Sequence, residues 1–359
     1  DVQHNNLVRK NRDIMRRFID VVCFLSGQEM AFRGHDESRD SLKLNKGNYV
    51  ELVKLLSEYD EKLKYHLEHS TTFTGMSNLI QNDLIASISN ILMDRIKREI
   101  NESNFISIVL DEATDVSNFS QLSPVFRYVT ERGQVHERFL GLINVSNDRT
   151  AEALYKIVVQ LIHNFGCEKK LIAQSYDGAA VMVSQLNGLQ SRTRVLDEEI
   201  KKRFSNLDSL LFLELLNVKN FDMYKHCFPE IAFQSLKDSY GNVFEFSSLR
   251  SQLVVTFISE DMRHKSVSDL LKFIRSNDLQ TAYCEVVKLC ELTLTIPATS
   301  ASVERSFSTL KRIKNYVRNS QGQERLTNLA VLSIERGLLK QLKQESTFYD
   351  LLNSLLARQ

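Results

Sequence analysis

Apolar positions recur at helical spacing through the first hundred residues of the chain. They fall every three or four residues over 47–70, and the same period returns over 76–101. Side chains at this spacing share one side of an α-helix. The pattern therefore predicts an N-terminal helical region over residues 1–103, with its apolar sides packed against a neighbouring element.

The pattern changes to that of β-strands after this region. Residues 105–110 form a short apolar run rich in β-branched side chains. This run predicts a buried strand that ends at Asp111. Two further strands are predicted over 122–130 and 135–145, joined by a hairpin with Gly133 in its loop.

A crossover back to the same sheet is predicted next. Residues 150–165 have an amphipathic helical pattern with Thr150 at the capping position. A fourth strand is expected over 170–176, ending at Asp177, and another helix over 178–192. The order β-β-β-α-β-α indicates a mixed α/β fold.

The rest of the chain has a helical pattern. Residues 207–216 are dense in leucine and predict a core helix. Two helices, after Ser302 and after Arg325, carry apolar stripes that include Val303 and Phe307. Such stripes pack within the chain, form a subunit interface, or do both.

Composition narrows the class of protein. The 359 residues are 43% hydrophobic and 25% charged, as in ordinary globular proteins, and the net charge of +1 creates no global field toward nucleic acid. The five cysteines are odd in number and form no C-x-x-C pair, so neither a disulfide framework nor a zinc site is expected. His66 and His69 are expected to be solvated, the alternative being a weak surface metal pair. No apolar run is long enough for a transmembrane span, so no membrane partner is expected. The chain begins at Asp1 rather than Met, which indicates a fragment or a partial gene product.

Three acids are candidates for metal chemistry. Asp111 and Asp177 follow predicted strands, and Glu304 lies in the first turn of a predicted helix. Two-metal sites need carboxylates that converge from different elements, and carboxylates suit Mg²⁺ or Mn²⁺. Taken singly, each acid is equally typical of a turn or a helix start.

The strings around these acids resemble the hAT superfamily of DNA transposases, in particular the zinc-finger MYM-type-like group. They are Leu-Asp-Glu-Ala-Thr-Asp from Leu110, Asp-Gly-Ala-Ala from Asp177 and Glu-Arg-Ser-Phe-Ser from Glu304, the last preceded by a small-residue turn after Pro297. The resemblance implies a ribonuclease H-like core. It also implies that Asp111, Asp177 and Glu304 form a DDE triad of catalytic and metal-binding residues, and that residues 291–345 dimerise.

The chain also departs from this family. Asp177 and Glu304 lie only 127 residues apart, and no Cys-x-x-His string follows Asp177. A core strand and most of the family's insertion domain are therefore expected to be missing. We expect a helical region over residues 1–103 and the first part of the core over 104–192. A helical remnant of the insertion is expected over 193–290, a dimerisation region that completes the core over 291–345, and a tail over 346–359.

Basic residues gather after Glu304. Six lie between positions 305 and 325 against one acid. They form either a solvated face or a contact for DNA phosphates. The DNA-binding candidates are Arg305, Lys311, Arg312, Lys314 and Arg318.

The expected function follows from these features. We expect a domesticated, nuclear, hAT transposase-derived protein that forms homo-oligomers through residues 291–345 and contacts DNA, without transposition activity. Two alternatives stay open: an active Mg²⁺-dependent DDE strand-transfer enzyme, and a non-functional truncated fragment.

Overall fold

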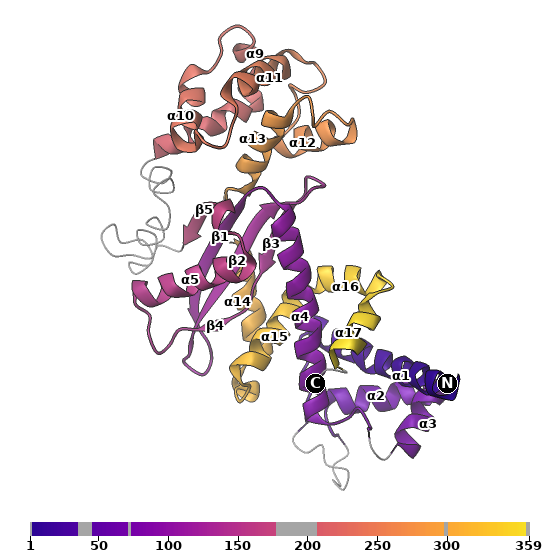
Figure 1. The fold of residues 1–359 in the computed structure, drawn as a ribbon. Coiled ribbons are helices and arrows are strands. Elements are labelled where there is room, and N and C mark those ends of the chain that lie inside the picture. The colour runs from indigo at the N-terminus through magenta and orange to yellow at the C-terminus, as the bar shows by residue number, and fades with distance from the viewer. Residues whose placement is uncertain (1, 35–44, 71–72, 177–206, 298–300, 357–359) are drawn as a thin grey trace.

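A computed structural model describes five stretches of the chain, residues 2–34, 45–70, 73–176, 207–297 and 301–356. Over these residues the protein has a mixed α/β fold with one five-stranded sheet. Helices from both ends of the chain gather beside and below the sheet, and a separate helical lobe stands above its other end (Figure 1). The helix predicted over 178–192 lies outside the described residues.

Four helices precede the sheet: α1 (Val2–Gly27), α2 (Asn48–Tyr59), α3 (Glu61–His69) and α4 (Asn78–Glu102). The helical character predicted over 47–70 is confirmed, but the chain divides there into two helices at Asp60. Its backbone is extended, and its carboxylate accepts a hydrogen bond from the Leu63 amide at 3.1 Å. A capping aspartate of this kind starts a new helix despite an uninterrupted apolar stripe.

The sheet contains β1 (Ile106–Thr114), β2 (Ser120–Val129), β3 (Val135–Phe139), β4 (Ile143–Asn144) and β5 (Leu171–Tyr176). Its order is β3-β2-β1-β5, with β4 also paired to β2. β2 runs antiparallel to β1, β3 and β4, whereas β5 runs parallel to β1. The predicted meander and crossover are confirmed. The strand predicted over 135–145 is instead divided at Gly141, whose φ of 130° breaks the extended chain.

The crossover consists of α5 (Ala151–Phe165) and the short 3₁₀ helix η1 (Glu168–Lys170). The predicted cap is confirmed: the Thr150 hydroxyl accepts a hydrogen bond from the Ala153 amide at 3.3 Å. Gly166 ends the helix in the left-handed conformation. These signals are local, which is why the pattern of the sequence alone placed this helix correctly.

The C-terminal part of the chain adds α14 (Ala301–Ile313), η5 (Tyr316–Arg318), α15 (Gln323–Ile334), α16 (Arg336–Gln344) and α17 (Phe348–Leu356). α15 and α17 pack along α4, and the Tyr349 hydroxyl of α17 donates to Asp20 of α1 at 2.7 Å. The predicted apolar stripes are buried inside the chain, with Val303 and Leu310 almost fully covered. The two ends of the chain and the sheet thus share one hydrophobic core.

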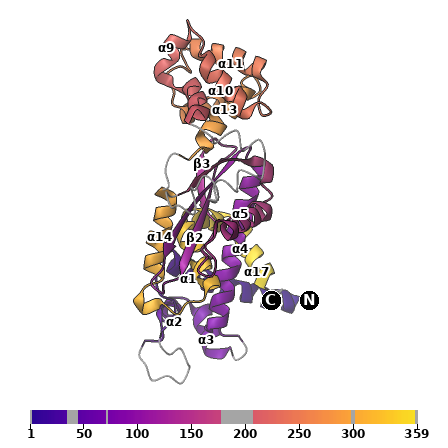
Figure 2. The same ribbon diagram turned by 90° about the vertical axis from the view of Figure 1, so that its left-hand side faces the viewer.

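Helices cover both faces of the sheet (Figure 2). On one face, Phe126 of β2 packs edge-on against Phe165 of α5. On the other, the hydroxyls of Ser123 of β2 and Ser306 of α14 are hydrogen bonded at 2.6 Å. Because side chains alternate between the faces of a strand, these contacts show which residues of β1 and β2 face α14.

The helical lobe has a second hydrophobic core. It consists of η3 (Leu207–Leu216), η4 (Val218–Asn220), α9 (Phe221–Tyr224), α10 (Glu230–Tyr240), α11 (Phe246–Ile258), α12 (Val267–Ser276) and α13 (Cys284–Thr295). The leucine-dense segment is a 3₁₀ helix rather than the predicted core α-helix, and Leu211 is exposed. α13 joins the lobe to the sheet, since Glu291 accepts a hydrogen bond from Asn104 at 2.7 Å. None of the described helices meets the length and apolarity needed to cross a membrane.

Candidate functional site

Asp111, the first candidate catalytic acid, lies inside a strand rather than at its end. β1 continues to Thr114, and Asp111 is the register partner of Ser123 on β2. The prediction that the strand ends at Asp111 was therefore wrong. Polar residues follow position 110 as they would in a turn, but pairing with β2 keeps them extended.

The register sets the face on which Asp111 lies. Directly opposed residues of antiparallel strands point to the same side of a sheet. Ser123 contacts Ser306 of α14, so Asp111 also faces the α14 side. One Asp111 carboxylate oxygen accepts a hydrogen bond from the Glu112 amide at 2.8 Å.

Asp177, the second candidate acid, lies outside the described residues. The structure does show where the chain reaches it. Tyr176 at the end of β5 is the parallel register partner of Leu110, the residue before Asp111. The described chain therefore leaves β5 beside the strand that carries Asp111.

Glu304, the third candidate acid, is exposed in the first turn of α14. The inner side of this helix carries Val303, Ser306 and Phe307, which are buried against the core. Glu304 and the next residue, Arg305, point in directions about 100° apart around the axis of α14. Among the described residues, His, Cys, Asp and Glu side chains form no group of three or more suited to a metal ion. The triad and its Mg²⁺ or Mn²⁺ therefore stay predictions.

Asp115, the last residue of the string that begins at Leu110, is the centre of a hydrogen-bond network. Its carboxylate accepts hydrogen bonds from Lys314 at 2.7 Å, from the Ser117 amide at 2.8 Å and from Gln121 at 3.1 Å. Burial raises the pKa of Asp115. The hydrogen bonds, led by that from Lys314, lower this pKa by a larger amount, so the net shift is downward. This network fixes the end of α14 to the loop between β1 and β2.

Lys314 is accordingly not a surface cation. Its side chain is only 3% exposed and forms the ion pair with Asp115. The sequence pattern predicts a DNA contact for this residue, whereas the structure gives it an internal role. The spacing of basic residues along α14 could not reveal this, since the partner lies 199 residues earlier in the sequence.

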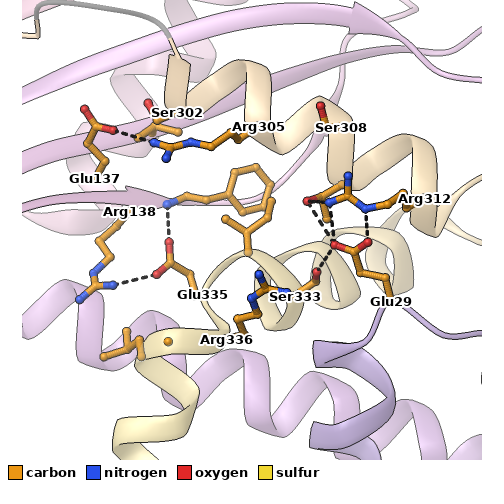
Figure 3. A pocket seen from close by; sticks show the side chains of 16 residues that line it. Glu29, Glu137, Arg138, Ser302, Arg305, Ser308, Arg312, Ser333, Glu335 and Arg336 are labelled. Atoms are coloured by element: carbon orange, nitrogen blue, oxygen red, sulfur yellow. Dashed lines mark hydrogen bonds and ion pairs between the residues drawn. The ribbon is translucent and has the colours of Figure 1, made fainter.

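A cavity of about 450 Å³ lies between β3, α14 and the α15–α16 junction (Figure 3). Two of the predicted DNA-binding residues line it: Arg305, which pairs with Glu137 at 3.5 Å, and Arg312, which pairs with Glu29. Arg336, the first residue of α16, lines the same cavity. Arg305 and Arg336 are exposed, and Glu304 is absent from the lining.

The remaining DNA-binding candidates lie elsewhere on the same helical region. Lys311 is exposed on α14. It precedes Arg312 in the sequence but does not line the cavity. Arg318 of η5 donates to the Glu29 backbone carbonyl at 3.0 Å, so it contributes to the contact between α1 and the C-terminal helices. Of the five candidates, Arg305, Lys311 and Arg312 thus remain exposed.

Sequence reasoning missed Arg138 and Glu335, which form the deep side of the cavity (Figure 3). Glu335 accepts hydrogen bonds from the Phe139 amide at 2.8 Å and from Arg138 at 2.9 Å. Burial raises the pKa of Glu335. The Glu335 carboxylate therefore satisfies the Phe139 backbone amide of the edge strand β3, which has no partner strand on that side among the described residues. No local signal marks this, because Glu335 and Arg138 are 197 residues apart.

The network extends to Glu99 of α4, which receives hydrogen bonds from Tyr128 at 2.7 Å and from Arg138 at 3.3 Å. Burial raises the pKa of Glu99, but hydrogen bonds from His136 and Tyr128 and the charge of Arg138 more than offset this and lower it to about 2. Glu99 therefore carries its charge on folding and joins α4 to the sheet.

The histidines expected to be solvated differ from each other. His69 is exposed, whereas His66 is partly buried beside the rings of Phe18 and Phe73. Burial, followed by the charge of Lys10, lowers the pKa of His66. The expectation for His66 was therefore wrong, because α3 packs this side of the helix onto α1.

Two protein families match parts of this chain. Residues 1–188 match the family described as the ZMYM1/FAM200 RNase-like domain, and residues 254–338 match the hAT family C-terminal dimerisation region. The first match covers more than half of the chain. The chain therefore belongs to the ZMYM1/FAM200 RNase-like domain family and is a hAT-derived protein with a hAT dimerisation region.

Individual relatives are distant. The chain is 21% identical over 201 residues to the human 52 kDa repressor of the inhibitor of the protein kinase, which covers 55% of this chain and 25% of that protein. The mouse protein of the same name matches with the same identity and coverage. The bovine General transcription factor II-I repeat domain-containing protein 2 is 23% identical over 111 residues, or 31% of this chain and 12% of the relative. The chain thus spans a quarter or less of these curated relatives.

Proposed function

We propose that this chain is a domesticated, nuclear, hAT-derived protein that self-associates and contacts the phosphate backbone of DNA, without transposition activity. The match to a dimerisation region supports self-association. The β-β-β-α-β order with parallel β1 and β5 supports a ribonuclease H-like core. The names of the relatives, a repressor and a transcription-factor repeat protein, support a nuclear location.

The observation that carries DNA contact is the exposed basic surface of α14 and α16. Arg305 and Lys311 project from α14, and Arg336 begins α16 across the cavity. Because the net charge of the chain is only +1, attraction to DNA must come from such a local surface. Contacts of this kind bind DNA of any sequence and weaken with salt.

Fluorescence anisotropy of a labelled DNA duplex tests this proposal. The triple variant Arg305→Ala, Lys311→Ala, Arg336→Ala is expected to bind more weakly, with the slope of log K against log salt reduced by about one for each phosphate that the protein no longer neutralises. Lys156→Ala is the matched control, because Lys156 is an exposed cation of α5 on the opposite face of the sheet. Equal binding by the triple variant and the wild type would refute the proposal.

A metal-dependent strand-transfer activity is the second candidate. It is favoured by Asp111 facing α14 and by the end of β5 beside β1. Asp111 and Glu304 offer the carboxylate oxygens that Mg²⁺ prefers. A divalent ion bound there would supply Lewis-acid stabilisation of a phosphoryl group.

Calorimetric titration with Mn²⁺ separates the two candidates. If the carboxylates form a site, Asp111→Asn and Glu304→Gln each abolish the binding, whereas Glu324→Gln, an exposed acid in the first turn of α15, leaves it unchanged. A folded wild-type protein that binds no Mn²⁺ would exclude the enzyme candidate and leave self-association and DNA contact.

A further inference from the structure

The apolar stripes of α14 and α15 do not provide a free surface for a second subunit. Val303, Leu310, Leu326 and Ala330 are buried within the chain. A dimerisation region must nevertheless present some surface to its partner. The apolar side chains of the matched region that remain exposed are candidates for that surface.

Among the described residues of 254–338, the large apolar side chains that remain exposed are Val254, Val255, Ile258 and Tyr316. Three of these four lie within two turns of α11, at 40%, 50% and 54% exposure respectively. Ile258 lies four residues after Val254 and three after Val255, and side chains at these two spacings are neighbours on a helix surface. The exposed side chains are therefore concentrated on one face of α11.

α11 is apolar on two sides. Its inner side, with Leu249, Leu253 and Phe257, is buried in the core of the lobe. Its outer side carries Val254, Val255 and Ile258. Apolar residues on both sides are typical of a helix that is covered on both sides.

Two more exposed apolar side chains lie on helices next to α11. Ile231 of α10 is 79% exposed, and Met223 of α9 is exposed as well. The ion pair of Arg250 with Glu230 places the start of α10 beside α11, and α9 packs against α11.

We propose that a second copy of this chain binds the outer face of α11, formed by Val254, Val255 and Ile258. This assignment rests on the proposed self-association and adds its location. The contact lies in the helical lobe rather than on the apolar stripes of α14 and α15.

Sedimentation equilibrium over a range of protein concentrations tests the assignment. Val255→Glu and Ile258→Glu place a charge in the centre of the contact and are expected to raise the dimer dissociation constant on the order of 30-fold or more. Leu79→Glu, at another exposed apolar residue outside the lobe, is the control and leaves dimerisation unchanged. Circular dichroism verifies that each variant is folded.

A dimer insensitive to Val255→Glu and Ile258→Glu would overturn the α11 assignment alone. A wild-type protein that is monomeric at every concentration would overturn the proposed self-association as well.

Discussion

Lys314 and Asp115 form an ion pair at 2.7 Å, with side chains only 3% and 1% exposed, that joins the end of α14 to the loop after β1. The Asp115 carboxylate also accepts hydrogen bonds from the backbone amides of Ser117 and Phe119. A buried pair with this many additional hydrogen bonds is costly to break, because the remaining charge loses its partner and cannot reach water. The pair therefore holds the helix that carries Glu304 against the sheet that carries Asp111.

Lys314→Met is expected to lower the free energy of unfolding by about 3–5 kcal/mol, since it leaves the Asp115 carboxylate buried without its cation. Urea denaturation followed by circular dichroism measures the change. Lys311→Met, at an exposed cation of the same helix, is expected to change stability by no more than about 0.5 kcal/mol. Similar losses for the two variants would contradict an internal role for Lys314.

Glu29 combines a side-chain contact with an unfavourable backbone conformation. Its φ is 56°, and its carboxylate bonds to Arg312 and to the Ser333 hydroxyl. Glu29→Ala and Glu29→Gly both lose the carboxylate, but glycine adopts positive φ without steric cost. We expect the glycine variant to be more stable than the alanine variant by about 1 kcal/mol. Thermal and urea unfolding of the two variants isolate this backbone contribution, and an alanine variant of equal or greater stability would disprove it.

Glu99 is expected to make stability depend on pH in the acid range. Hydrogen bonding and the charge of Arg138 lower its pKa from 4.5 to about 2 on folding, despite burial, which raises it. Its contribution is therefore complete above the unfolded pKa and is lost as pH falls through the folded pKa. At about 1.4 kcal/mol per pKa unit, it amounts to about 3 kcal/mol at pH 7 and about half of that at pH 3.

Denaturation of the wild type and of Glu99→Gln at pH 7 and pH 3 measures this dependence. The difference in stability between the two proteins is expected to shrink as the pH falls. A difference that is constant over this range would show that Glu99 has an ordinary pKa in the folded protein.

Gly141 separates β3 from β4 and faces α15. Its φ is 130°, and a Cβ built at this position would lie 2.9 Å from the Thr327 methyl carbon. Gly141→Ala is expected to destabilise the protein by about 1–3 kcal/mol, through both backbone strain and this contact. Gly337→Ala in α16, where a Cβ meets nothing within 4 Å, is the control and is expected to be neutral or stabilising. Equal losses of stability in Gly141→Ala and Gly337→Ala would show that neither the positive φ of Gly141 nor its contact with Thr327 disfavours a side chain there.

Local signals along the chain account for the elements that were predicted correctly. The apolar run before Asp111, the Thr150 cap and the apolar period of 150–165 led to the strands, the crossover helix and their order. The same kind of signal failed where a neighbour decided the outcome. Pairing with β2, a separate strand, extended β1 past Asp111.

By itself, the sequence determined the family, the mixed α/β class and the candidate acids, because motifs and periodicity depend on residues close together in the chain. Only the tertiary structure decided that Lys314 is internal, that Glu335 and Arg138 complete a cavity, and that the apolar stripes of α14 and α15 are covered while the outer face of α11 is not. Each of these outcomes depends on partners far away in the sequence. Burial and ion pairing are properties of the packed molecule, and no pattern within a single segment specifies which distant side chain will meet it.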